Sequence, residues 1–272
     1  MNIGICIRHG RDTLRGSLLE AKKHGFQHIQ LVSWDTALWT REEADRVRGL
    51  LMETGMSVTA FWCGWEGPRV WDFLQGPETL GIVPEAYRAL RLKNLLDGAA
   101  FARWLGVRDI VTHAGFIPET PGDPRYAEVV GALRGLASSY REQGQNFLFE
   151  TGQETPVTLL RCIEDVGLPN LFINLDPANL LMYGKANPVD ALDVFGHLVR
   201  GVHAKDGLYP TDGKKLGRET KVGEGRVDFP RLIAKLKAGG FDGSLTIERE
   251  ISGPQQLADI LDTQRYLGGL IE

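Results

Sequence analysis

The pattern that decides the fold lies in residues 146–176, which read NFLFETGQETPVTLLRCIEDVGLPNLFINLD. Two short apolar runs, Asn146–Glu150 and Leu171–Asp176, flank an amphipathic stretch, Thr155–Val166, which is followed by Gly167. Continuous apolar runs of this length are typical of parallel strands covered by helices. A glycine directly after a helix suits a left-handed C-cap. The stretch therefore predicts a strand, a helix and a second, parallel strand.

The same unit recurs along the whole chain. The apolar runs that we interpret as strands are Asn2–Ile7, His28–Val32, Ser57–Trp62, Asp109–His113, Asn146–Glu150, Leu171–Asp176, Val199–His203 and Ser244–Glu248. The segments that we interpret as helices are Asp12–His24, Arg41–Thr54, Pro84–Leu105, Pro124–Gln143, Thr155–Val166, Asn187–His197, Phe229–Ala238 and Gln255–Gly268. Eight alternations with no linker between them predict an α/β protein, a single (β/α)₈ TIM barrel that forms one domain over residues 1–272.

Two connecting segments are unusually long. Residues 63–83 follow the third predicted strand, and residues 206–227 follow the seventh. Both come after strand ends, where TIM barrels carry their active sites, and loops of this length in a compact domain are usually functional. We interpret them as walls or a lid of the active site.

Composition narrows the class of protein. The 272 residues carry a net charge of −4, so no general positive field attracts nucleic acid. The cysteines Cys6, Cys63 and Cys162 form no CxxC pair, which fits a reducing compartment. No apolar run approaches 18 residues and no secretory leader is evident, so we expect a cytoplasmic protein that does not span a membrane. The tryptophan-rich segment after the third strand leaves a homo-oligomer open.

Ionisable residues end four successive predicted strands. These residues are Glu150, Asp176, His203 and Glu248. In a barrel the strand ends converge on one point, and three carboxylates and an imidazole gathered there require a compensating cation. Mixed oxygen and nitrogen ligands suit one divalent metal ion, Mn²⁺, Mg²⁺, Co²⁺ or Zn²⁺.

Each of these residues also has an ordinary structural interpretation. A single strand-end carboxylate is commonly solvated or caps a helix. Asp176 precedes Pro177, so it is a candidate cap for a following helix. Glu250 is an alternative to Glu248, which we prefer because it directly ends the apolar run.

Five stretches of the chain resemble motifs of the xylose isomerase-like barrel superfamily, in particular its sugar-phosphate isomerase/epimerase group. They are FLFET (147–151), NLDPAN (174–179), VHAKDG (202–207), GEGRVDF (223–229) and GSLTIERE (243–250). The resemblance implies that Glu150, Asp176, His203 and Glu248 are the metal ligands. By resemblance to the ketose 3-epimerases, Glu150 and Glu248 are also the catalytic acid–base pair on opposite faces of the substrate carbon.

The resemblance implies a metal-dependent sugar or keto-polyol isomerase or epimerase. Such an enzyme abstracts a proton beside a carbonyl and passes through an enediolate. A lyase or dehydratase acting on a keto-sugar or inosose is an alternative, because it begins with the same proton abstraction. An apurinic/apyrimidinic endonuclease is disfavoured because Asn179 stands where that class has a histidine. A non-catalytic sugar-binding barrel is a further alternative.

Six further residues are candidates for contacting a small carbohydrate substrate. They are Trp62, His113, Glu154, Asn179, Lys205 and Arg226. Lys205 has the same strand parity as His203 and is a candidate for holding an anionic group. Arg226 lies in the glycine-framed GEGR stretch, where it is placed to close over a substrate phosphate or carboxylate. Helix capping for Glu154 and Asn179, and ordinary packing for His113 and Trp62, are the structural alternatives.

Overall fold

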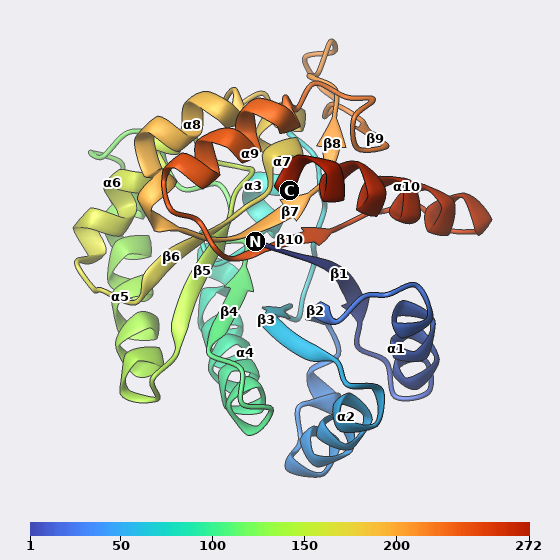
Figure 1. The fold of residues 1–272 in the computed structure, drawn as a ribbon. Coiled ribbons are helices and arrows are strands. Elements are labelled where there is room, and N and C mark those ends of the chain that lie inside the picture. The colour runs from blue at the N-terminus through green and yellow to red at the C-terminus, as the bar shows by residue number, and fades with distance from the viewer.

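Eight parallel strands close into a barrel in the computed structural model, which describes residues 1–272 (Figure 1). The strands are β1 (Asn2–Arg8), β2 (His28–Ser33), β3 (Ser57–Cys63), β4 (Asp109–Thr112), β5 (Asn146–Glu150), β6 (Leu171–Leu175), β7 (Val199–Ala204) and β10 (Ser244–Ile247). Their order around the barrel is β1-β10-β7-β6-β5-β4-β3-β2, so the first and last strands of the chain close it. The prediction of a (β/α)₈ TIM barrel is confirmed.

Helices surround this barrel (Figure 1). They are α1 (Leu14–Lys23), α2 (Arg41–Thr54), α3 (Gly76–Thr79), α4 (Glu85–Trp104), α5 (Pro124–Glu142), α6 (Pro156–Val166), α7 (Pro177–Met182), α8 (Pro188–Phe195), α9 (Phe229–Ala238) and α10 (Pro254–Ile271), with 3₁₀ turns η1 (Thr36–Leu38) and η2 (Gly196–Leu198). All eight predicted helices are present. The short helix α3 was not predicted, and α7 was considered only as the helix that Asp176 would cap. No helix is both long enough and apolar enough to cross a lipid bilayer.

The glycine signals mark helix ends as the sequence indicated. Gly55 after α2 and Gly167 after α6 adopt φ values of 69° and 70°, which residues with a side chain rarely adopt. Their N–H groups donate to the carbonyl oxygens of Leu51 and Ile163 in the last helical turn. Each glycine thus ends its helix with a satisfied backbone and turns the chain towards the next strand.

The middle of the barrel interior contains a polar layer. The largest hydrophobic cluster includes Phe61 and Phe101, from β3 and α4. By contrast, Gln30 and Asn174, from β2 and β6, are buried and hydrogen-bonded to each other across the barrel, Nε2 to Oδ1, at 3.3 Å. This polar layer lies beneath the side chains that end the strands.

A buried arginine on α4 holds the long segment after β3. Arg91 is fully buried, and its guanidinium donates to the carbonyl oxygens of Gly81 at 2.5 Å and Pro68 at 2.7 Å. The same guanidinium lies 5.4 Å from the centre of the Trp65 ring. These contacts tie residues 63–83 to the barrel, which fits a wall better than a freely moving lid.

The segment after β7 is held by a second buried charge. It contains a hairpin of β8 (Asp206–Gly207) and β9 (Glu219–Thr220). The Asp206 carboxylate accepts hydrogen bonds from the backbone N–H groups of Gly207, Gly223, Gly225 and Val227 at 2.8–3.0 Å. We call this arrangement the Asp206 clasp. It fixes the two ends of residues 206–227 against each other.

Candidate metal centre

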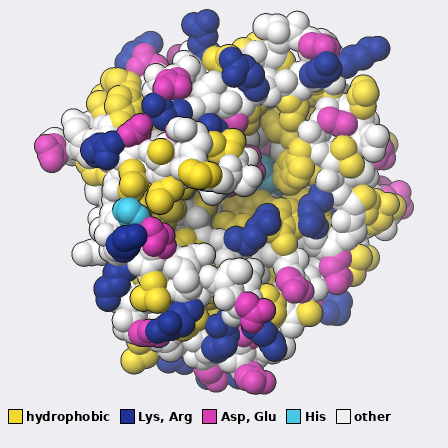
Figure 2. All heavy atoms as spheres, turned by 90° about the vertical axis from the view of Figure 1, so that its right-hand side faces the viewer, with side chains coloured by type: hydrophobic (Ala, Val, Ile, Leu, Met, Phe, Trp, Pro, Cys, Tyr) yellow, Lys and Arg dark blue, Asp and Glu magenta, His cyan; other side chains and the backbone are white.

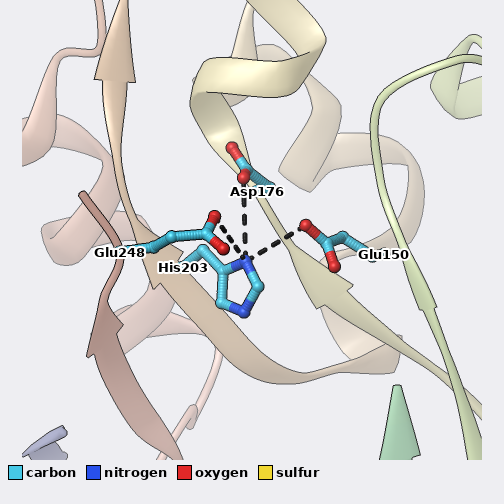
Figure 3. A group of neighbouring side chains, drawn as sticks. All are labelled: Glu150, Asp176, His203 and Glu248. Atoms are coloured by element: carbon cyan, nitrogen blue, oxygen red, sulfur yellow. Dashed lines mark ion pairs between the residues drawn. The ribbon is translucent and has the colours of Figure 1, made fainter. Parts of the chain in front are cut away.

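Four ionisable side chains meet at the carboxyl ends of neighbouring strands. Glu150 ends β5, Asp176 follows β6, His203 lies in β7 and Glu248 follows β10. One ligand atom from each lies within 4.8 Å of the others (Figure 3). His203 Nδ1 lies 3.2 Å from Glu150 Oε1, 3.7 Å from Asp176 Oδ2 and 3.3 Å from Glu248 Oε2. The structure therefore gathers the residues that the sequence singled out as ligands.

Asp176 serves as a helix cap and faces the cluster at the same time. Its Oδ1 atom accepts a hydrogen bond from the backbone N–H of Asn179 at 2.8 Å, which caps α7. Its Oδ2 atom is buried and has no hydrogen-bond partner. The two interpretations of Asp176 are compatible, because each applies to a different oxygen of the carboxylate.

The orientation of His203 is set by the polar layer below it. His203 Nε2 lies 2.7 Å from Gln30 Oε1, and the amide of Gln30 donates to Asn174 Oδ1 at 3.3 Å. This orientation of the Gln30 amide makes Nε2 of His203 the protonated donor. The other ring nitrogen, Nδ1, is buried without a hydrogen-bond partner and faces the carboxylates.

Without a metal ion, the side chains at the centre carry more negative than positive charge. Burial lowers the pKa of His203, but the charges of Glu150 and Glu248 outweigh it and raise that pKa well above its usual value. Burial raises the pKa of Glu150, but His113 and His203 outweigh it and hold that pKa well below its usual value. A positive charge close to Nδ1 of His203 would therefore stabilise the three carboxylates. The unpartnered atoms and the mixed donor set fit one divalent metal ion.

Gln30 offers a test of this orientation. Gln30→Met removes the acceptor for His203 Nε2–H, and we expect metal affinity to fall on the order of tenfold or more, because such outer partners orient ligating histidines. Gln30→Glu keeps an oxygen acceptor and should retain the affinity. Titration of each purified variant with Mn²⁺ measures the effect. Equal losses in both variants would contradict the assignment of Gln30 as the acceptor that orients His203.

The comparisons with known proteins match this fold over nearly the whole chain. Residues 18–267 match the model of the family described as xylose isomerase-like TIM barrel. The chain belongs to this family. A xylose isomerase domain protein from Planctomyces limnophilus has a solved structure that is 33% identical, with a TM-score of 0.90 over 98% of this chain and 95% of that chain.

More distant structures share the xylose isomerase-like fold alone. The structure of 3-keto-D-glucoside 4-epimerase from E. coli is 20% identical, with a TM-score of 0.73 over 99% of both chains. Other structures of this fold are ketose 3-epimerases and a dehydratase. An uncharacterized protein of Methanocaldococcus jannaschii is 28% identical over 178 residues, which are 61% of this chain. The matched region spans 59% of that curated relative.

In this xylose isomerase-like barrel, three of the predicted substrate-contacting residues surround Glu150. The indole N–H of Trp62 donates to Glu150 Oε2. Asn179 Nδ2 and His113 Nε2 each lie 3.4 Å from Glu150 Oε1. All three also line the cavity above the cluster. They fix the direction of the Glu150 carboxylate and are at the same time open to a bound ligand.

Lys205 joins the opposite side of the cluster. Its buried ammonium lies 3.1 Å from Glu248 Oε2, 3.8 Å from Asp176 Oδ2 and 2.5 Å from Glu250 Oε2. Glu250 is largely exposed, whereas Glu248 contacts His203. Burial raises the pKa of Glu248, but Lys205 and His203 outweigh it and lower that pKa to about 2. The geometry favours Glu248 over Glu250 as the ligand.

Two predicted substrate-contacting residues lie outside the cavity. Arg226 is exposed and does not line it. The physical reason is the Asp206 clasp, which holds the backbone of Gly225 and Val227 inward and leaves the side chain between them facing solvent. Glu154 is buried and also absent from the cavity wall. The expectation that these two side chains contact substrate is therefore not supported by their positions.

Sequence reasoning missed the residues that complete the cavity wall. The cavity has a volume of about 790 Å³, within the range of small-molecule sites. The additional lining residues include Arg8, Arg69, Trp71 and Tyr183. Arg8 ends β1, so the strand-end rule that found Glu150 would also have found it. No local pattern marks Arg69 or Trp71, which come from the long segment after β3.

The buried carboxyl of Glu154 predicts a pH-dependent stability. Burial raises the pKa of Glu154 from 4.5 to about 7, against the opposing charge of His113. The folded protein therefore binds this proton more tightly than the unfolded chain, and the stabilisation is lost as the pH rises from 4.5 through 7. Glu154→Gln should raise the free energy of unfolding by about 3 kcal/mol at pH 8 and by less than about 1 kcal/mol at pH 5.

Chemical denaturation at the two pH values measures this difference. Glu142→Gln, at the exposed end of α5, is the matched control and should change neither value. A gain from Glu154→Gln that is equal at both pH values would contradict a raised pKa in the folded protein.

Proposed function

We propose that the protein is a divalent-metal-dependent isomerase or epimerase of a sugar or keto-polyol. The observation that carries this proposal is the placement of two carboxylates around one ligand cluster. Glu150 and Glu248 approach His203 from opposite sides, because β5 and β10 lie on either side of β6 and β7 in the barrel (Figure 3). A substrate carbon held above the cluster would have one carboxylate available to each of its faces.

The four ligand residues would bind the metal, and two of them, Glu150 and Glu248, would also transfer protons. A divalent cation bound by Glu150, Asp176, His203 and Glu248 would polarise the substrate carbonyl and so acidify the neighbouring C–H bond. One glutamate then removes the proton from that carbon, and the other returns a proton to the opposite face. Aldose–ketose isomerisation results if a single glutamate removes and returns the carbon-bound proton. A second proton must then move between the two substrate oxygens.

The surroundings of the two glutamates suit this division. Trp62, Asn179 and His113 hold Glu150 in one orientation, so little rearrangement is needed before it accepts a proton. Lys205 lies beside Glu248 and is available to stabilise negative charge that develops on a substrate oxygen. The indole rings of Trp34 and Trp62, whose centres are 4.8 Å apart, offer flat apolar surfaces to the C–H groups of a sugar.

Elimination is the second candidate function, and Lys205 favours it. A dehydratase begins with the same proton abstraction but then expels a hydroxyl group from the next carbon. The Lys205 ammonium is a hydrogen-bond donor close to Glu248, where it can stabilise the oxygen of a leaving hydroxyl group. The residues at the centre therefore suit a lyase acting on a keto-sugar or inosose as well.

Solvent isotope exchange separates these functions. The Mn²⁺-loaded protein is incubated with ketoses and keto-inositols in D₂O, and the products are analysed by NMR. Deuterium at the carbon beside the carbonyl, together with a new diastereomer or aldose, supports the isomerase or epimerase. Loss of water supports the lyase. Absence of deuterium from every compound of the panel would contradict proton-transfer chemistry on these classes.

A further inference from the structure

Two arginines on the cavity wall have no acidic partner. Arg8, at the end of β1, and Arg69, in the segment after β3, are exposed and line the same cavity as the metal cluster. Neither makes an ion pair or a side-chain hydrogen bond within the protein. The remaining arginine of the wall, Arg249, is paired with Glu219 at 2.9 Å and Asp259 at 2.8 Å. Arg8 and Arg69 are thus the two arginines of the cavity wall whose guanidinium groups have no ion-pair or hydrogen-bond partner.

Arg69 is positioned by aromatic stacking. Its guanidinium lies 4.4 Å from the centre of the Trp34 ring. Trp34 packs against Trp62, whose indole donates to Glu150. A stacked guanidinium keeps its N–H donors free at the edges of its plane. Arg69 is therefore linked through two rings to the proposed catalytic carboxylate, with its donors available to a ligand.

The charges around the cavity favour binding of an anion. The acidic side chains at the centre are Glu150, Asp176, Glu248 and Glu250, and the last three of them lie against Lys205. With a bound divalent cation, these four carboxylates and the one ammonium would carry a net charge of −1. Arg8 and Arg69 then add two positive charges on the same wall, and no acidic side chain pairs with either of them. Figure 2 shows a hollow with hydrophobic side chains on its walls and Lys or Arg side chains at its edge.

We propose that the substrate carries an anionic group, a phosphate or a carboxylate, which Arg8 and Arg69 bind at the rim while its carbonyl end reaches the metal cluster. This inference rests on the proposed function and specifies its substrate class. Planar guanidinium groups match the oxygen geometry of both anions, so the two sources share one recognition chemistry. The sequence suggested Arg226 for this task, but the cavity presents Arg8 and Arg69 instead.

The test compares matched neutral and anionic probes on the Mn²⁺-loaded protein. D-fructose is the neutral probe, D-fructose 6-phosphate carries a phosphate and 5-keto-D-gluconate carries a carboxylate. Binding is measured by calorimetry, and deuterium exchange in D₂O is followed in parallel. We expect at least one anionic probe to bind on the order of a hundredfold more tightly than D-fructose. The preferred probe identifies the anion.

Variants assign this preference to residues. Arg8→Gln and Arg69→Gln should each weaken binding of the preferred anionic probe by about tenfold and affect D-fructose binding much less, with metal content unchanged. Arg103→Gln, at the exposed end of α4, removes the same charge far from the cavity wall and is the control. Circular dichroism verifies that every variant is folded.

The outcomes separate this inference from the proposed function. Exchange on the neutral probe that equals exchange on both anionic probes overturns the anionic substrate and leaves the proposed function standing. Arginine-dependent binding of an anionic probe without exchange on any compound supports the anion site and counts against the proposed function. If no probe shows exchange and binding is the same in the wild-type and Arg→Gln proteins, both are overturned.

Discussion

Glu150→Gln is expected to lower the rate of deuterium exchange into substrate on the order of a thousandfold, the usual scale for a general base. The amide is nearly the same shape and keeps an oxygen that can ligate a metal, but it does not accept a proton from carbon. Burial favours the neutral form of Glu150, yet His113 and His203 hold its pKa well below the usual value, so the carboxylate is ready to act as a base.

The measurement separates proton transfer from metal binding. Exchange is followed by NMR at saturating Mn²⁺, and the metal content of the variant is determined alongside. Glu142→Gln, exposed on α5, is the matched control and should exchange at the wild-type rate. Exchange by metal-loaded Glu150→Gln at more than a tenth of the wild-type rate would refute the assignment of Glu150 as a base.

Removal of metal by a chelator is expected to abolish activity and to lower the melting temperature by about 5 °C or more. Without a cation, the buried carboxylates of Glu150 and Asp176 repel each other around His203 Nδ1. Adding back Mn²⁺, Mg²⁺, Co²⁺ or Zn²⁺ should restore both properties, and the most effective ion identifies the preferred metal. Elemental analysis and thermal scanning follow the two changes.

The variant Asp176→Asn, which should bind metal weakly, is compared with the wild-type protein in the same chelator experiment. The amide oxygen can still cap α7, so the fold is retained, but one anionic ligand is lost. We expect the melting temperature of this variant to respond weakly to chelator and to added metal. A wild-type protein that is metal-free and fully active would contradict a metal-dependent mechanism altogether.

The sequence predicted the barrel and its strand-end cluster because both follow from local regularities. Alternating apolar runs and helix-ending glycines such as Gly167 define the strand–helix rhythm. The barrel geometry then brings Glu150 and His203 together without further information. Asp176 shows the limit of this reasoning, since the sequence presented capping and ligation as alternatives and only the structure assigns them to different oxygens of the carboxylate.

Features that depend on side chains meeting across the barrel were not predictable from one stretch of sequence. Gln30 reads as an isolated polar residue within an apolar strand, and its contact with His203 exists only because the barrel closes. Arg69 is placed by stacking on Trp34, which is 35 positions away in the sequence. The GEGR stretch indicated a ligand loop, whereas the clasp on Asp206 turns the backbone beside Arg226 inward and leaves its side chain exposed outside the cavity.

The Asp206 clasp also bears on how this barrel can be modified by design or by evolution. It anchors residues 206–227 at their base, while the outer part of the same loop, residues 209–218, carries none of the hydrogen bonds to Asp206. Leu216, in that outer part, reaches the cavity wall. Substitutions or insertions there alter the shape of the entrance without disturbing the metal ligands. The loop thus divides into a base that is held by hydrogen bonds to Asp206 and an outer part open to diversification of substrate range.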